Sequence, residues 1–233
     1  MMIGSMTPDF TYFLPGEPGR MQTHSVAGLF WFCWPVGMAV WMLFVRVLEQ
    51  PTFALLPEHW RTRFPSSSRD VSLNALMWTS IAVILGAATH IVWDSFTHRG
   101  TPVVNSIPAL RAVAFHIDGW RIRWFMLLQH ASSLAGLALL ALWAWRRPPG
   151  RYPRTAPCEV SHAMRVRAIS VLVAVSLSLA FASYVYHSDT WFLRRLFHFA
   201  VGGMTGWMLA WIAIAIFVSR TERRALTAPN PPA

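Results

Sequence analysis

The 233-residue sequence contains no lysine, two cysteines and few charged residues. Charged side chains make up 13% of the chain, whereas a soluble protein carries about 25%. Cys33 lies in an apolar run and Cys158 in an Arg-rich segment, so neither a disulfide framework nor a cysteine-based metal site is expected. With 55% hydrophobic residues, thirteen Trp and fifteen Phe, the composition excludes an ordinary soluble protein and indicates a membrane protein.

Because lysine is absent, the basic excess of twenty residues over ten acidic ones is entirely arginine. A net charge of +10 on a soluble protein would suggest nucleic-acid binding. Here the arginines lie between long apolar runs, where they set the topology of a membrane protein. We therefore expect the lipid bilayer as partner and no nucleic acid.

Five apolar runs are long enough to cross a hydrocarbon core of about 30 Å. They cover about 27–48, 72–96, 124–145, 168–186 and 196–218. The sequence thus predicts an all-α, polytopic integral membrane protein, with residues 1–233 as a single membrane domain. Pro35 and Gly37 predict a kink in the first run. In the last, the spacing of Gly202, Gly203 and Gly206 permits close helix packing, with simple flexibility as an equal alternative.

Residues 1–26 are not expected to span, because three prolines and two acidic residues interrupt them. No basic stretch followed by an apolar run marks a signal peptide, so the first membrane helix is expected to act as the insertion signal. The opening Met-Met-Ile-Gly resembles the end of an apolar element, which predicts a truncated N-terminal segment. Residues 219–233 are predicted to form a disordered cytoplasmic tail.

The arginines also predict the orientation of the helices. Thirteen lie in the first and third loops and the C-terminal tail, and seven lie on the opposite side. The positive-inside rule then places the C-terminus in the cytoplasm. This topology puts seven of the nine histidines and three aspartates on the outer side: His24, His90, His98, His116, His130, His187 and His198, with Asp9, Asp118 and Asp189. A shared site near the outer interface would explain this grouping, although loops collect polar residues in any case.

The strongest chemical signal is the string LGAATHIVWDSFTHRG, from Leu85 to Gly100. His90, Asp94 and His98 lie four residues apart, so on a helix their side chains share one face within roughly 80°. Imidazole and carboxylate groups at the end of a membrane helix are typical ligands of a divalent metal such as zinc. The alternative is a hydrogen-bonded polar cap that ends the helix.

Other polar residues extend this candidate site. His24 is a further metal-ligand candidate or an interfacial histidine, and Asp9 is a ligand, a general base or a helix N-cap. His130, beside Gln129, lies at a depth where polar groups are costly and could bind substrate or donate to Asp94. Arg121 and Arg123, near the outer end of the third helix, could contact lipid phosphate or an anionic substrate, but snorkelling side chains are the favoured interpretation. No phosphate loop, nucleophile elbow or dinucleotide fingerprint is present.

Four strings together resemble a bacterial integral-membrane family, domain of unknown function 4184: GSMTPDFTYF, THSVAGLFWFCWPVG, LGAATHIVWDSFTHRGTPV and LLQHASSLAGL. More distantly, the pattern is similar to the membrane-bound metal-dependent hydrolases. The resemblance implies a polar set of Asp9, His24, His90, Asp94 and His98, with Gln129 and His130 from the next helix. Members usually carry an upstream Ser-His-Pro string, which this sequence lacks.

These observations favour a metal-dependent hydrolase at the outer interface of a bacterial inner membrane, acting on a lipid-like or membrane-borne substrate. His24, His90, Asp94 and His98 would bind the metal, and Asp9 and His130 would serve catalysis. The alternative is a non-enzymatic scaffold or transport-related protein with a structural polar cluster. Ion translocation is less favoured, because the first, third and fifth helices lack mid-bilayer acids.

Overall fold

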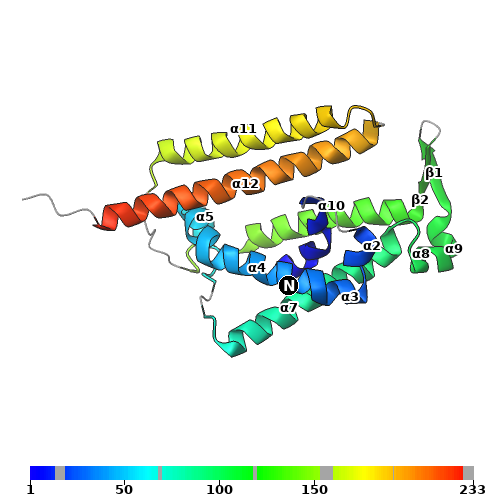
Figure 1. The fold of residues 1–233 in the computed structure, drawn as a ribbon, viewed down its shortest axis with the longest axis horizontal. Helices are drawn as coiled ribbons and strands as arrows, with labels where there is room; N and C mark the ends of the chain where they lie inside the picture. Colours follow the sequence, from blue (N-terminus) through cyan, green and yellow to red (C-terminus); the bar gives the residue numbers. More distant parts are fainter. Residues whose placement is uncertain (14–18, 68–69, 118–119, 153–159, 191, 228–233) are drawn as a thin grey trace, which may run out of the picture. The chain divides into compact units, whose positions relative to one another are not determined.

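The computed structural model describes residues 1–13, 19–67, 70–117, 120–152, 160–190 and 192–227, most of them helical (Figure 1). Five helical segments are long and apolar enough to cross a membrane: Val26–Leu55, Leu73–Ser106, Trp124–Arg146, His162–Tyr186 and Arg194–Arg220. The predicted all-α polytopic membrane fold is thereby confirmed. The chain divides into two compact units, Met1–Val40 with Val71–Pro148 and Trp41–Asp70 with Pro149–Ala233.

In the first unit the N-terminal segment packs against the long helix α7 (Leu73–Thr97). It consists of α1 (Met2–Met6), a 3-10 segment η1 (Thr7–Phe13) and the short helix α2 (Arg20–Thr23). Gly4 and Gly86 let the two backbones meet, because a Cβ on Gly4 would overlap the carbonyl of Val83 and one on Gly86 that of Met1. This close approach brings η1 alongside α7.

The first spanning segment begins with α3 (Val26–Gly28), a π-helical turn η2 (Leu29–Cys33) and α4 (Trp34–Leu43). The π-helical turn ends two residues before Pro35, which has no N–H to continue an α-helical ladder. Phe32 and Cys33 form a buried cluster with Ala87 of α7, and Phe10 of η1 packs against it. The cluster therefore fixes η1, the first span and α7 relative to one another.

The second half of this unit runs from α7 to α10 (Trp124–Arg146). Two short helices, α8 (Pro102–Ser106) and α9 (Pro108–Arg111), lead into an antiparallel hairpin of β1 (Val113–Ile117) and β2 (Trp120–Arg123). The sequence prediction missed the hairpin. It had placed Arg121 near the end of the third helix, whereas Arg121 lies in β2 and Arg123 is the N-cap residue of α10.

The second unit contains a π-helical segment η3 (Phe44–Leu48), α5 (Glu49–Leu55), α6 (Glu58–Arg61) and the helical pair α11 (His162–Tyr186) and α12 (Phe192–Thr227). Gly206 lies against α11 so closely that a Cβ would be 2.8 Å from the Cα of Ser176. Close packing, rather than flexibility, thus accounts for the small residues of the last span. Helix α12 continues to Thr227, where the prediction had a disordered tail from 219, because Arg, Glu, Ala and Leu are all good helix formers.

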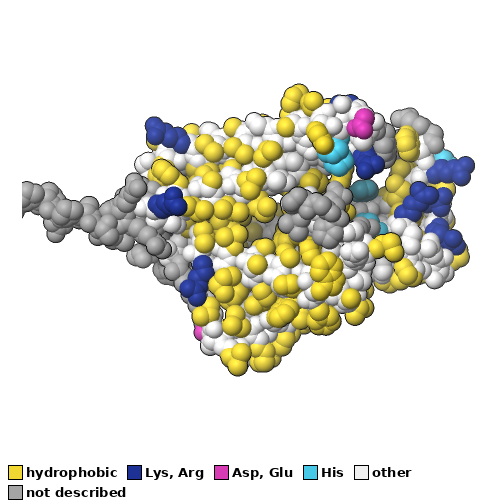
Figure 2. All heavy atoms as spheres, in the orientation of Figure 1, with side chains coloured by type: hydrophobic (Ala, Val, Ile, Leu, Met, Phe, Trp, Pro, Cys, Tyr) yellow, Lys and Arg dark blue, Asp and Glu magenta, His cyan; other side chains and the backbone are white. Residues whose placement is uncertain are grey.

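The long helices present large apolar side chains outward, as in α10, where Leu134, Leu137 and Trp145 are each about two-thirds or more exposed. Figure 2 shows hydrophobic side chains over the visible faces of the helices and arginines near their ends. Exposed apolar area on this scale is unfavourable in water and suits contact with lipid.

We expect Gly86→Val to lower the free energy of unfolding by about 1–3 kcal/mol, because the new side chain would push α1 away from α7. The midpoint of thermal unfolding in detergent measures this loss. Gly136→Val in α10 is the matched control, since a Cβ there meets no atom within 4 Å. Equal midpoints for the two variants would show that the α1–α7 contact adds no stability.

Candidate metal centre

Four polar side chains from three separate segments of the first unit meet at one point. Asp9 comes from η1, His24 follows α2, and His90 and Asp94 lie one turn apart on α7. One ligand atom from each residue lies within 4.8 Å of all the others. Three of the four predicted metal ligands, His24, His90 and Asp94, are therefore brought together with Asp9, which was predicted to serve catalysis.

Local structure explains how each group arrives there. Thr7, Pro8 and Thr11 are buried around Asp9 in η1, so that segment has little freedom to turn. Ser25 caps α3 by accepting a hydrogen bond from Gly28 N, which orients the residue before it, His24. Because His90 and Asp94 are at i and i+4 of α7, they share a helix face, as the spacing predicted.

The nitrogen–oxygen distances in this group are close to the ligand–ligand distances around a tetrahedral metal. His24 Nε2 lies 3.2 Å from Asp9 Oδ1 and 3.3 Å from Asp94 Oδ2, and His90 Nε2 lies 3.6 Å from Asp9 Oδ2 and 3.4 Å from Asp94 Oδ2. Ligands bound tetrahedrally at about 2.1 Å would be about 3.4 Å apart. Charge-assisted hydrogen bonds are shorter, at about 2.7–2.9 Å.

The directions of the groups support the same interpretation. His90 Nε2 is buried and, although two carboxylates are near, forms no hydrogen bond with a described residue. His24 Nδ1 lies 3.1 Å from Thr23 Oγ1, so its N–H can donate there and leave a lone pair on Nε2. Two imidazoles and two carboxylates that converge in this way fit a divalent cation such as zinc.

His98, predicted as a ligand, lies beside the four-residue centre and not in it. Helix α7 ends at Thr97, and His98 has extended backbone angles because the chain turns at Gly100, whose φ is +84°. His98 Nδ1 lies 3.3 Å from Asp94 Oδ1, the oxygen that faces away from His24 and His90. Its Nε2 accepts a hydrogen bond from Gln129 Nε2 at 3.0 Å. His98 is therefore placed to orient Asp94.

Gln129 and His130, both of α10, have different surroundings. Gln129 reaches His98, whereas His130 is exposed and outside the centre, so the structure offers no contact for the predicted catalytic role of His130. The two positions differ by about 100° around the helix. Trp93 Nε1 of α7 donates to Ser132 Oγ of α10 at 3.0 Å, and this contact fixes which face of α10 meets α7.

Of the seven histidines predicted on the outer side, three lie around Asp94: His24, His90 and His98. Of the others, His116 is exposed on β1. His187 and His198 belong to the second unit, where their rings stack at 3.5 Å. Asp118 lies outside the described residues.

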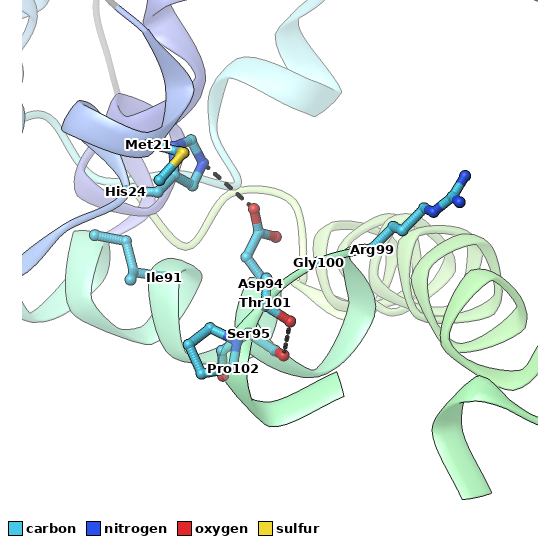
Figure 3. Close-up of a pocket in the computed structure, with 9 residues that line it drawn as sticks. All are labelled: Met21, His24, Ile91, Asp94, Ser95, Arg99, Gly100, Thr101 and Pro102. Carbon is cyan, nitrogen blue, oxygen red and sulfur yellow. Dashed lines mark hydrogen bonds and ion pairs between the residues drawn. The ribbon is translucent and has the colours of Figure 1, made fainter. Parts of the chain in front are cut away.

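A pocket of about 440 Å³ opens beside the centre (Figure 3). Its polar edge is formed by His24 and Asp94. Its apolar wall is formed by Met21, Ile91 and Pro102. Thr101 Oγ1 donates to Ser95 O at 2.6 Å, which holds the turn after α7 against the pocket. Arg99 also lines the pocket, and Figure 3 shows its side chain extending away from Asp94. The centre thus adjoins a space with both polar and apolar surface.

The fold and this centre define a multi-pass helical membrane protein with a histidine–carboxylate cluster at the end of one span. A family model described as Domain of unknown function (DUF4184) matches residues 1–219, and the chain belongs to this family. The family resemblance found in the sequence is confirmed. No curated protein matches the chain, and no solved structure matches it.

We expect Gln129→Leu to weaken divalent-metal binding about 10-fold, because groups that orient a metal ligand typically contribute 10- to 100-fold to affinity. The variant removes the hydrogen bond to His98 and so loosens the group that orients Asp94. Zinc titration of the detergent-purified protein measures the affinity. His130→Leu, one residue away and exposed, is the control and should bind zinc as the parent does. Equal affinities in both variants would contradict the orienting role of His98.

Proposed function

We propose that the protein is a metal-dependent hydrolase that acts on a lipid-like or membrane-borne substrate. The observation that carries the proposal is the convergence of Asp9, His24, His90 and Asp94 at metal-ligand spacing, beside a pocket at the end of a membrane-spanning helix. Two neutral imidazoles and two carboxylates carry a charge of −2, which a divalent cation balances. Such a metal, when bound, activates water for attack on an ester or phosphoester.

The residues of this chain would divide the work as follows. His24, His90 and Asp94 hold the metal, and Asp9 either completes the ligand set or accepts a proton from the attacking water. The Asp9 side chain is 43% exposed against 12% for Asp94, so Asp9 is the member of the set with access to solvent. His98 keeps Asp94 in position.

The surroundings of the centre favour an amphiphilic substrate. Met21, Ile91 and Pro102 offer apolar surface to an acyl or isoprenoid chain, while the metal ligands face its polar group. The site lies near the C-terminal end of α7, which supports a position where the apolar part of a bilayer meets water. Both reactants, a lipid-like molecule and water, are available there.

The arginine distribution supports an orientation with the C-terminus in the cytoplasm and the centre on the outer face of a bacterial inner membrane.

The second candidate is a non-enzymatic membrane protein in which the cluster only ties segments together. The observation in its favour is that His24 and His90 each lie within 3.6 Å of both carboxylates, so protonated imidazoles could bridge η1 and α7 with no metal. This candidate predicts that the protein holds no metal and that removal of a carboxylate lowers its stability.

Metal content, measured by elemental mass spectrometry on the detergent-purified protein, separates the two candidates. We expect about one zinc or manganese per chain, lost in Asp94→Ala and Asp94→Asn. Because Asn keeps the shape of Asp, the Asp94→Asn variant can be measured if Asp94→Ala fails to fold. Asp189→Ala, an exposed aspartate of the second unit, should retain the metal.

Hydrolysis of phospholipid and carboxylic-ester lipids in mixed micelles should accompany the metal and disappear with Asp94→Asn. A folded parent protein without metal, or equal metal in the parent and the Asp94 variants, would contradict the proposal and favour the structural candidate.

A further inference from the structure

The hairpin β1–β2 leads directly into the spanning helix α10. Arg123 ends β2 and Trp124 begins the spanning helix α10, so no linker separates the hairpin from the span. Its base is fastened to α9, because Trp124 N donates to Ala112 O at 3.2 Å and the Arg123 guanidinium donates to Arg111 O at 3.0 Å. Trp124 is half exposed, as is typical of a tryptophan at a membrane–water interface.

The register of the hairpin separates its side chains into two faces. Phe115 is opposite Ile122, and His116 is opposite Arg121. Residues that are directly opposite in an antiparallel pair share a face, and successive residues alternate. One face therefore carries Phe115, Trp120 and Ile122, and the other carries His116 and Arg121.

Both faces are accessible. Phe115 is 42% and Trp120 58% exposed, which is costly for two aromatic rings in water. Arg111 and Arg121 are exposed, and neither forms an ion pair with another described residue. Figure 2 shows arginine side chains gathered over the place of the hairpin and α9 in Figure 1. The connection of residues 98–123 holds four arginines against one aspartate.

We propose that this hairpin is a binding surface for anionic lipid headgroups of the membrane that the protein spans. Phe115, Trp120 and Ile122 enter the boundary between headgroups and acyl chains, and Arg121 with Arg111 contacts lipid phosphates. The apolar face accounts for the exposed aromatics and the basic face selects the charge of the lipid. This inference does not depend on the hydrolase proposal, since it uses no residue of the metal centre.

Spin labels on adjacent residues test which face meets the lipid. The labels are attached at Phe115→Cys and His116→Cys in the full chain with Cys33→Ala and Cys158→Ser, reconstituted in vesicles of phosphatidylcholine and phosphatidylglycerol in equal parts. We expect oxygen, which partitions into the bilayer, to relax the label at 115, and a water-soluble nickel chelate to relax the label at 116. Equal access of the chelate to both labels would overturn the proposal, as would shielding of both labels from oxygen and chelate, which would indicate protein cover.

The charge dependence is tested with the label at 115. We expect Arg121→Gln to lower the ratio of oxygen access to chelate access at this label about five-fold in the mixed vesicles. In phosphatidylcholine alone the substitution should change this ratio little. Arg147→Gln, whose guanidinium stacks on Trp143 at the other end of α10, is the matched control and should leave the label unchanged. An equal response to both substitutions, or the same immersion in the two kinds of vesicle, would overturn the selection of anionic lipid.

Discussion

The carboxylate of Asp94 is the group on which the first unit depends. The Asp94 side chain is 12% exposed on a largely apolar span, where a carboxylate without partners would be costly. Three imidazoles, of His24, His90 and His98, lie within 3.4 Å of its two oxygens. His24 reaches it only because α1 and η1 pack closely on α7. The glycine contact, the buried cluster around Cys33 and the capped turn at Ser25 all serve that approach.

Charge alone does not decide how the cluster is neutralised. Two carboxylates and two imidazoles are balanced equally by two protons on the rings or by one divalent cation. The four nitrogen–oxygen distances of 3.2–3.6 Å are longer than charge-assisted hydrogen bonds and are compatible with ligands around a common centre, which supports the proposed cation. His98 contrasts with them, since its two ring nitrogens have a carboxylate oxygen and an amide as neighbours.

Sequence patterns predicted what depends on one helix at a time. The i and i+4 spacing of His90 and Asp94, and the number of spanning helices, follow from local periodicity. The patterns failed where packing between elements decides. His130 was the predicted catalytic residue of the third span, whereas the rotation of α10 brings its neighbour Gln129 to His98. The end of α7 moved His98 off the helical face. The hairpin was missed because β1 and β2 are short strands between much stronger helical runs.

For the proposed hydrolase, the position of the centre would reconcile two requirements that conflict elsewhere in a membrane protein. Hydrolysis needs water, and a lipid-like substrate needs apolar surface. Water is scarce within the bilayer. In a loop far from the bilayer, apolar surface would be exposed to water. The C-terminal end of α7 would meet both requirements. Ile91 lies one turn before Ser95 on the pocket wall and offers apolar surface. The chain then turns at Gly100 towards the hairpin. A hairpin that binds headgroups would hold this end at the membrane surface, so that the pocket opens at the depth where lipid esters lie.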